Sequence, residues 1–334
     1  METRGNQEYM KDNNTYLPQT KVYAGRIKDT TTLIQSSSGG AFTAISDSFL
    51  ENGDAIVCAL YNYETHAMEF KLITDKSDRD AARGSKYVQS KPGTVFRQAN
   101  HWLKENPEKN LLFVGMGCQA DGFRKYIETV GIRDRVWIAD IICHGSPSPK
   151  LWREYADRLE KKYRGSMSEL SFKDKRNGWR APTAKAVING REVFLSDYVK
   201  IFYNRCALRP SCHECPFATI ERKTDMTIGD FWHIEEKMPD FYDPNGNSLF
   251  LIHTDKGMQL FESIKVSVEY RESNTIDCWQ ANLEKPTLVS DMRKQFWEDY
   301  QSNGIKYIMK KYAEDSFGIV AKRFLRKIKR KLIR

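Results

Sequence analysis

The sequence has no apolar run of the ~18 residues that a transmembrane helix needs. Its first residues, METRGNQEYMKDNNTY, are polar and lack the apolar stretch of a secretory signal. These absences predict a cytoplasmic protein, in which thiols stay reduced. An odd number of cysteines, seven, then argues against a disulfide framework and favours metal binding, catalysis or simple burial.

Two common nucleotide-binding motifs are missing as well. The sequence contains no G-x-G-x-x-G fingerprint and no Walker A loop, which disfavours ordinary Rossmann dinucleotide binding and P-loop nucleotide binding. What remains is a chain of 334 residues, 40% hydrophobic and 12% aromatic. It is long enough for one large domain or two ordinary ones, with a sizeable buried core.

The positive charge is concentrated at one end of the chain. The formal net charge is +9, but the last 13 residues, KRFLRKIKRKLIR, hold eight basic residues and no acidic one. No nucleic-acid-binding module accompanies them, so nucleic acid is not an expected partner. Within residues 317–334, apolar residues stand four apart at Val320, Phe324, Ile328 and Leu332. This spacing predicts an amphipathic helix on the anionic inner face of a membrane; the alternative is a solvated helix docked on the body or on an acidic partner.

Hydrophobic runs alternate with amphipathic segments, which predicts an α/β fold. Two short apolar runs, NLLFVGM and RVWIADIIC, are bounded by helical patterns, as expected for parallel strands covered on both faces. We predict a mixed, largely parallel sheet flanked by helices, with a small antiparallel insertion at 168–195 that turns over Asn189-Gly190, and a helical C-terminal extension. The expected strands are 21–27, 54–61, 68–73, 110–116, 135–143, 225–231 and 248–254, and the expected helices are 39–53, 96–106, 119–131 and 151–163.

Three of the cysteines lie within ten residues, in the spacing Cys206-x5-Cys212-x2-Cys215, with Pro216 directly after. The C-x-x-C turn brings two sulfurs to one side, and the third can join from the other arm of the loop. An iron–sulfur cluster, a zinc site and a redox dithiol all remain open. Iron–sulfur is favoured because proline closely follows C-x-x-C in ferredoxin-type loops, and because His213 inside the turn is poorly placed as a zinc ligand.

A fourth ligand must come from elsewhere in the chain. Cys118 and Cys143 each follow the C-terminal end of a predicted parallel strand, where α/β sheets gather ligands. Simple burial is the alternative for both, although flanking glycines allow close approach of a cofactor. For Cys58, inside a strand, and for Cys278, in a stretch expected to be helical, burial is the better interpretation.

Two glycine- and serine-rich loops are candidate anion sites. Ser37, Ser38, Gly39 and Gly40 directly precede a helix, whose N-terminal N–H groups favour an anion such as pyrophosphate. A serine cap on a tight turn is the simpler alternative. The stretch ARGSKYVQS, residues 82–90, places cations, small residues and an aromatic ring side by side. It would hold a phosphate and stack on a flat ring, and an exposed turn explains it equally well.

Seven segments occur in an order that resembles one known family. They are SSSGGAFTAI, RGSKYVQS, LFVGMGCQADGF, DIICHGSPSPKLW, RCALRPSCHECPFA, TDMTIGDFW and SLFLIHTDKG, within residues 21–260. Together they resemble the coenzyme F420 hydrogenase/dehydrogenase beta-subunit family. The resemblance implies an oxidoreductase that binds FAD and a 4Fe-4S cluster and passes electrons between them. Many bacterial relatives lie among surface-polysaccharide genes, which makes polysaccharide metabolism an expected setting.

The resemblance assigns roles by position. Both glycine- and serine-rich loops would hold FAD, with Cys118 nearby, through Ser37, Ser38, Gly39, Gly40, Thr43, Arg83, Gly84, Ser85, Lys86 and Tyr87. Iron would be ligated by Cys206, Cys212, Cys215 and Cys143, with Cys118 as the alternative fourth ligand. His144, the one catalytic candidate, would donate a proton or hydrogen-bond near the flavin.

This assignment divides the chain into three parts. Residues 1–20 are expected to form a polar tail and residues 277–334 a helical extension with the basic end. The α/β domain between them, 21–276, would consist of a flavin-binding part at 21–105 and a cluster-binding part at 106–276.

The chain departs from the family pattern at two points. Gly117 precedes Cys118 where many relatives have the proline of G-x-P-C-Q, which changes the expected loop shape but keeps the thiol. No cysteine precedes Cys58, so the N-terminal ferredoxin module of many bacterial relatives is missing. A separate ferredoxin-like protein is therefore the expected electron donor or acceptor, and the small-molecule substrate is unknown. The rival interpretation is a zinc-stabilised, non-enzymatic accessory protein of polysaccharide biosynthesis.

Overall fold

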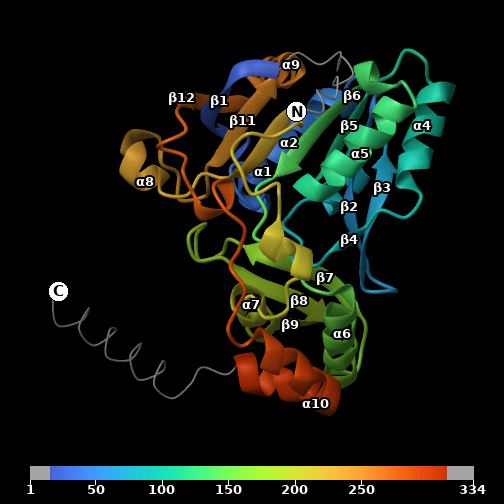
Figure 1. Ribbon diagram of the computed structural model, residues 1–334, viewed down its shortest axis with the longest axis vertical. Coiled ribbons are helices and arrows are strands. Elements are labelled where there is room, and N and C mark those ends of the chain that lie inside the picture. The colour runs from blue at the N-terminus through green and yellow to red at the C-terminus, as the bar shows by residue number, and fades with distance from the viewer. Residues whose placement is uncertain (1–15, 314–334) are drawn as a thin grey trace, which may run out of the picture.

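The computed structural model describes residues 16–313, which form one large and one small β-sheet with flanking helices (Figure 1). Nine strands of the described chain make up the large sheet. In spatial order they are β12 (Val268–Ser273), β1 (Tyr16–Ile27), β11 (Ser248–Thr254), β10 (Met226–Asp230), β6 (Val136–Ile141), β5 (Leu111–Met116), β2 (Ala55–Asn62), β3 (Ala67–Ile73) and β4 (Ser90–Lys91).

The parallel strands lie at the centre of the large sheet. β10, β6, β5 and β2 pair in parallel, whereas β12, β1 and β11 add antiparallel strands at one side. At the other side β3 pairs antiparallel with β2, and the two-residue β4 pairs in parallel with β3. The α/β class with a mixed sheet is confirmed. The buried central strands carry the near-continuous apolar runs that parallel strands need.

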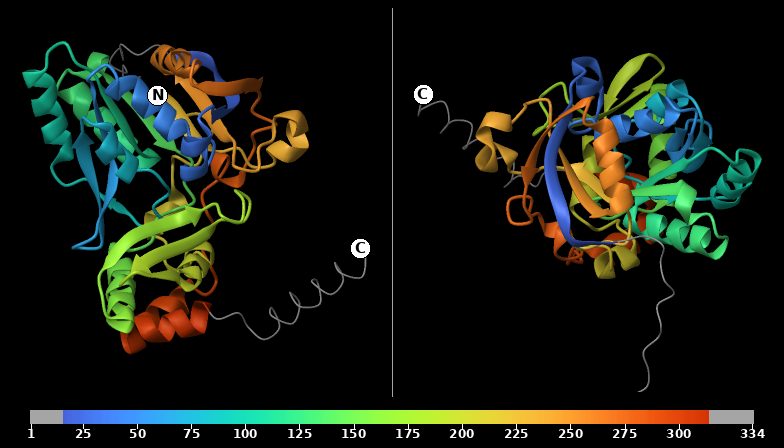
Figure 2. Two further views of the ribbon diagram at one scale, coloured as in Figure 1. Left: turned by 180° about the vertical axis from the view of Figure 1, so that it is seen from behind. Right: turned by 90° about the horizontal axis from the view of Figure 1, so that it is seen from above.

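Helices cover both faces of the large sheet and one face of the small sheet (Figures 1 and 2). No helix among residues 16–313 is both long and apolar enough to cross a membrane. The helices are α1 (Thr30–Gln35), α2 (Ala41–Leu50), α3 (Lys76–Ala81), α4 (Val95–Glu105), α5 (Gly117–Thr129), α6 (Pro149–Tyr163), α7 (Ser196–Tyr203), α8 (Ile234–Lys237), α9 (Asp255–Ile264) and α10 (Arg293–Ala313).

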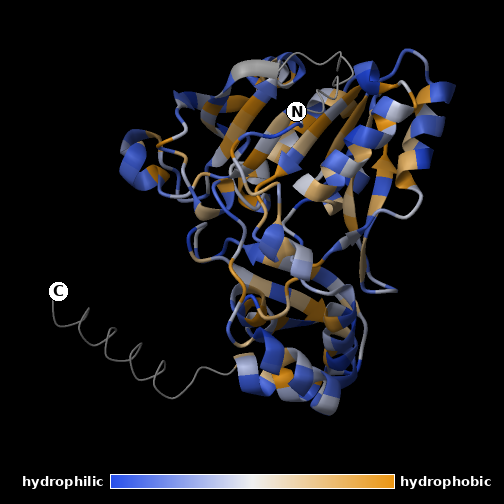
Figure 3. Cartoon of the chain, in the orientation of Figure 1, coloured by the Kyte–Doolittle hydropathy of each residue, from blue (hydrophilic) through white to orange (hydrophobic). Residues whose placement is uncertain are grey.

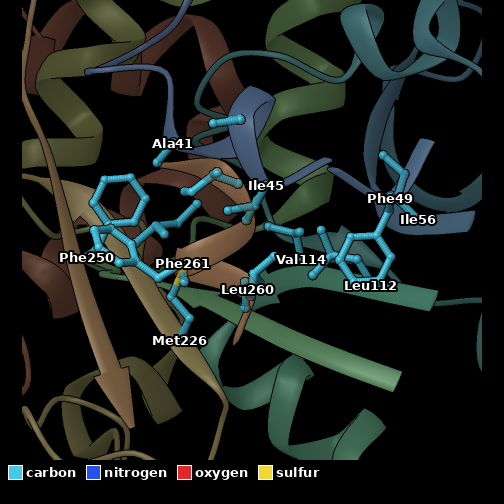
Figure 4. Close-up of a cluster of buried hydrophobic side chains, with 14 of the residues drawn as sticks. Ala41, Ile45, Phe49, Ile56, Leu112, Val114, Met226, Phe250, Leu260 and Phe261 are labelled. Atoms are coloured by element: carbon cyan, nitrogen blue, oxygen red, sulfur yellow. The ribbon is translucent and has the colours of Figure 1, made fainter. Parts of the chain in front are cut away.

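Alternating side chains of the central strands fill two separate cores. On one face, α2 and α9 pack Ile45 and Phe261 against Leu112 and Met226 (Figure 4). On the other face, α4 and α5 cover the intervening residues of the same strands, such as Phe113. Because successive residues of a strand point to opposite faces, a sheet buried on both sides needs this continuous apolar sequence.

The small sheet forms a second layer beneath the large one (Figure 1). It consists of β7 (Met167–Asp174), β8 (Thr183–Ile188) and β9 (Arg191–Phe194), all antiparallel. Asn189 and Gly190 join β8 to β9 with φ angles of 51° and 69°, as a two-residue hairpin of this kind requires. The expected antiparallel insertion is therefore confirmed, and its buried face packs on α6, α7 and α10.

The structure differs from the predicted elements at both ends. Residues 277–292 are not helical, apart from one short 3-10 turn at Ala281–Leu283, and α10 begins only at Arg293. Pro286 contributes to this, because it disfavours helix for the residue before it. β1 begins at Tyr16, inside the expected polar tail, and the sequence did not indicate α9 or β12. The predicted amphipathic helix at 317–334 lies outside the described residues.

One buried carboxylate ties three strands together. Asp225, just before β10, accepts hydrogen bonds from the Ile138 N–H at 2.8 Å and the Thr254 hydroxyl at 2.8 Å. It also pairs with the Arg133 guanidinium at 2.6 Å, and both side chains are buried. A buried charge left without its partner is costly, so this network fixes the point at which the chain enters β10.

Replacing Asp225 with asparagine should lower the free energy of unfolding by about 3–5 kcal/mol, because the Arg133 charge then stays buried without an anion. Urea denaturation followed by circular dichroism measures the change. Glu108, which is exposed, provides the matched control: Glu108→Gln should change the free energy by no more than about 0.5 kcal/mol. Equal stability of both variants would contradict the role given to Asp225.

Candidate functional site

The cysteine-bearing loop between α7 and β10 docks on the loop that follows β6. Leu208 and Pro147 form an isolated antiparallel bridge, and the Arg209 N–H donates to the Ser146 carbonyl at 3.0 Å. Gly145 has a φ angle of 127°, and a Cβ there would lie 2.8 Å from Leu208 and 3.4 Å from the Cys212 Cβ. Glycine is therefore needed for this close approach.

The start of α5 meets the same loop from a third direction. A Cβ on Gly117 would lie 2.9 Å from the Cβ of Phe217, two residues after Cys215. Cys118 is the next residue of α5, so the helix start carries its thiol to the cysteine-bearing loop. Three segments that are distant in sequence thus converge at the carboxyl ends of β5 and β6, where α/β sheets commonly bind ligands.

Four thiols lie close enough to influence each other electrostatically. Desolvation raises the pKa of Cys118, and the neighbouring Cys215 and Cys212 raise it further. Burial raises the pKa of Cys143 to about 12, opposed by the Gly145 N–H that donates to its sulfur at 3.3 Å. The other thiols around Cys143 add to the increase; they are Cys212, Cys118 and Cys215.

Cys206 has different neighbours. Its side chain is fully buried in the core beneath the small sheet, and its sulfur lies 3.5 Å from the Ser290 hydroxyl. Burial raises its pKa, while Ser290, Arg293 and Arg205 lower it. The described contacts therefore gather Cys212 and Cys215 with both Cys118 and Cys143, and leave Cys206 to one side.

The segment just before α10, which contains Thr287, contacts both His144 and His213. The Thr287 hydroxyl donates to the His144 carbonyl at 2.5 Å, and the His213 Nδ1 lies 2.8 Å from the Thr287 carbonyl. The Nε2 atoms of both rings are buried without a hydrogen-bond partner in the described chain. Burial lowers the pKa of His144, so its imidazole is disposed to be neutral. Its predicted catalytic role remains a prediction.

A buried ion pair joins the cysteine-bearing loop to β6. Asp140, at the end of β6, pairs with Arg222 at 3.0 Å, and both are almost completely buried. Burial raises the pKa of Asp140, while Arg222 and the Thr227 hydroxyl at 2.5 Å lower it. Since Arg222 belongs to the stretch that leads from the cysteine-bearing loop into β10, the pair anchors that loop to β6.

The two glycine- and serine-rich loops are in direct contact. The backbone N–H of Ser85 donates to the Ser37 hydroxyl oxygen at 2.7 Å, and the two hydroxyls lie 3.1 Å apart. Arg83 bridges further, to the Thr43 hydroxyl at 3.1 Å and to Gln35 at 2.8 Å. The loops that the resemblance assigns to one cofactor therefore lie together, although they are 48 residues apart at Ser37 and Ser85.

Glycines let the first loop approach the sheet closely. A Cβ on Gly39 would lie 2.4 Å from both the Gly25 carbonyl and the Ser248 nitrogen. Gly40 caps α2 with a φ angle of 87° and has no side chain of its own to cap the helix. The Ala41 N–H reaches the Ser248 hydroxyl at 3.4 Å. The N-terminal N–H groups of a helix without a side-chain cap are suited to an anion. Gly84 has a φ angle of 92°. A Cβ built on it would lie 4.0 Å from the Ser37 hydroxyl oxygen, which is the nearest atom.

Lys86 and Tyr87 occupy different environments. The Lys86 ammonium donates to carbonyls of its own loop, among them Gly84 at 3.0 Å, and burial lowers its pKa to about 8. Tyr87 stacks on Phe202 of α7, with ring centroids 4.3 Å apart and planes inclined by 5°. Phe202 also contacts the His144 ring at 5.2 Å. Three aromatic rings thus connect the second loop with the residue beside Cys143.

Sequence reasoning missed the lysines that join the small sheet to the site. Lys175 donates to the carbonyls of Leu33 at 2.6 Å and Ser38 at 3.0 Å, and also to that of Asn245. Burial lowers its pKa to about 8. Lys173 binds both carboxylate oxygens of Asp230 at 2.8 Å. Two lysines in KDKRNGW were the available signal, but only the tertiary contacts reveal where they reach.

Comparison with known proteins supports the same assignment. Residues 108–277 match the family that describes the C-terminal part of the coenzyme F420 hydrogenase/dehydrogenase beta chain, and residues 22–95 match the family of its N-terminal part. No curated protein sequence matches the chain. A solved chain from the F420-reducing NiFe hydrogenase complex of Methanosarcina barkeri is similar, with a TM-score of 0.53 and 17% identity over 88% of this chain and 95% of that chain.

The structural likeness shows the shared fold alone, because the identity is low. The family match carries the assignment, since its C-terminal part by itself spans half of the sequence and contains the cysteine-bearing loop, while the N-terminal part contains both glycine- and serine-rich loops. The chain therefore belongs to the coenzyme F420 hydrogenase/dehydrogenase beta-subunit family of oxidoreductases.

Proposed function

We propose that the protein is an iron–sulfur flavoprotein that carries electrons between FAD and a 4Fe-4S cluster. The observation that carries the proposal is the ring contact of Tyr87, Phe202 and His144, because it links the two candidate cofactor sites through adjacent side chains. Members of the family generally bind FAD, and the residues expected for both groups are present in this chain.

The donor set fits an iron–sulfur cluster. We assign the ligands to Cys118, Cys143, Cys212 and Cys215, in place of the set that included Cys206. The cysteine-bearing loop touches the chain beside Cys143 at Gly145 and the chain beside Cys118 at Gly117. Beyond the effect of burial, Cys212 and Cys215 raise the pKa of both Cys118 and Cys143. Among residues 16–313, no three His, Cys, Asp or Glu side chains converge closely enough to hold a single metal ion. Four neighbouring thiols are the usual donor set for a group of several iron and sulfide ions.

The glycine- and serine-rich loops fit the flavin nucleotide. The α2 N-terminus, with Gly40 at its cap, offers N–H groups to a pyrophosphate. The joined Ser37 and Ser85 fix the two loops relative to each other, and Lys86 adds a positive charge. Tyr87, whose pKa is raised well above its usual value by burial, stays a neutral ring and orients the loop against α7.

The chain's own residues would position and shield the two groups. When bound, FAD supplies two-electron chemistry toward a small substrate and the cluster supplies one-electron steps. Thr287 ties the segment before α10 to the carbonyl of His144, the residue next to Cys143. Lys175, which directly follows β7 of the small sheet, fixes the position of the Ser38 loop through a hydrogen bond to the Ser38 carbonyl. A separate ferredoxin-like protein would exchange single electrons with the site.

Two finer expectations stay predictions. The first is a role in surface-polysaccharide metabolism, which follows only from the resemblance. The second is the rival zinc-stabilised accessory protein. Four thiolates are a common zinc donor set, but the described thiols would have to move closer together to hold one zinc ion. Metal analysis separates the candidates: anaerobically prepared protein with iron and flavin absorption supports the electron carrier, whereas colourless protein with one zinc per chain supports the rival.

Serine substitutions should identify the cluster ligands. Cys118→Ser, Cys143→Ser, Cys212→Ser and Cys215→Ser should each lose most of the iron and the broad absorption near 400 nm, because the cluster needs all four thiolates. The measurement is iron and sulfide content after anaerobic reconstitution. Cys206→Ser is the matched control, being the same change in the same loop, and should keep the iron content of the unaltered protein. If Cys206→Ser lost its iron while Cys118→Ser kept it, the ligands would instead be Cys206, Cys212, Cys215 and Cys143.

Removing the hydroxyl that joins the two loops should weaken flavin binding. Ser37→Ala leaves the Ser85 N–H without its acceptor, a loss of about 1–2 kcal/mol that corresponds to roughly tenfold weaker FAD affinity. Fluorescence titration of flavin-depleted protein with FAD measures this. The control is Ser48→Ala, since the Ser48 hydroxyl bonds only within α2, to the Ile45 carbonyl. Equal FAD affinity of both variants would remove Ser37 from the proposed site.

A further inference from the structure

A basic depression lies at the pole of the molecule opposite the large sheet. It has a volume of about 300 Å³ and lies between α6, α7 and α10. Its charged lining residues are Arg158, Lys306, Lys310 and Asp197. No ion pair within residues 16–313 neutralises the three cations. Figure 1 places α10 as the outermost element at this end.

Three acidic side chains of α6 and α7 have partners within the fold. On α6, Glu160 and Asp157 lie 3.3 and 3.7 Å from His66 of the loop between β2 and β3. Asp197 is occupied by hydrogen bonds from the Tyr155 hydroxyl and the Tyr198 N–H. These three acids thus have partners within the fold, and the depression itself is lined by three cations and one carboxylate.

α10 presents a basic surface that also exposes an aromatic ring. It carries five basic and two acidic side chains, and most of it is coloured hydrophilic in Figure 3. One of the acids, Asp299, is buried and accepts hydrogen bonds from Lys311 and Tyr312, each at 2.6 Å. Tyr307 is 40% exposed beside Lys306. Tyrosine and lysine side chains combine an apolar body with a polar end, which suits the boundary of a bilayer.

The position of the chain end agrees with this interpretation. Ala313, the last described residue, lines the depression itself. The sequence that follows contains eight basic residues in its last 13 positions, with apolar residues spaced four apart. Mutual repulsion disfavours that basic sequence as the occupant of a basic depression, whereas both would be attracted to the same anionic surface.

We propose that the α6–α10 pole, with Arg158, Lys306 and Lys310 at its centre, docks on a bilayer that contains anionic lipids. A lipid phosphate is the anion that the depression would accept. The inference goes beyond the proposed redox function and does not depend on it, because none of these residues belongs to either cofactor site.

Vesicle co-sedimentation of the full-length protein tests the proposal. The protein should sediment with phosphatidylglycerol-containing vesicles but not with pure phosphatidylcholine vesicles, and the bound fraction should fall as salt is raised. Lys306→Glu with Lys310→Glu should weaken binding roughly tenfold or more, because each cation near an anionic surface contributes substantially. The milder pair Lys306→Gln with Lys310→Gln should give an intermediate loss.

The matched control, Lys71→Glu with Lys104→Glu, reverses the charge of two exposed lysines at the other end of the molecule. It should bind the vesicles as strongly as the unaltered protein does. A variant that ends at residue 316 should bind more weakly, with its remaining binding lost on Lys306→Glu and Lys310→Glu. Unchanged binding of the full-length Lys306→Glu, Lys310→Glu protein would overturn the proposal. So would retention on immobilised polyglutamate without vesicle binding, which would identify an acidic polypeptide as the partner.

Discussion

The docking of the cysteine-bearing loop on the end of β6 is the constraint on which the candidate site depends. The loop has little regular structure of its own, and its position is set by the Leu208–Pro147 bridge and by the space that Gly145 leaves open. The Asp140–Arg222 pair and Asp225 hold the chain as it returns to the sheet. Since these contacts join elements that are far apart in sequence, the site exists only in the completed fold.

This arrangement places several thiols beside each other, of which Cys118 is exposed and the others are partly buried. Burial and mutual proximity both favour the protonated form, as the raised pKa values of Cys118 and Cys143 show. A bound cation reverses that preference, because coordination requires thiolates and releases protons. Metal binding at such a site is therefore coupled to the ordering of the loops that carry the thiols. The buried Asp140–Arg222 pair holds these loops near the geometry for binding before the metal arrives.

Local pattern predicted much of the fold. The apolar runs at β5 and β6 and the Asn189-Gly190 turn carry their signals within a few residues, and all were confirmed. The region after Asp277 misled the prediction, because its composition permits a helix while Thr287 is held by His144 of the loop after β6 and by His213 of the cysteine-bearing loop. The gathering of Cys118 with Cys143 could be anticipated from strand ends. The separation of Cys206 could not, since it depends on how α7 packs.

The stacking of Tyr87 on Phe202 has a mechanical consequence for the whole molecule. Tyr87 belongs to the loop that meets Ser37, whereas Phe202 belongs to α7, which packs against α10. Closely packed interiors transmit displacement rather than absorb it. A ligand that restricts the movement of the 82–90 loop must therefore also restrict the movement of α7. Through this pair of rings, binding beside the large sheet is coupled to the pole formed by α7 and α10.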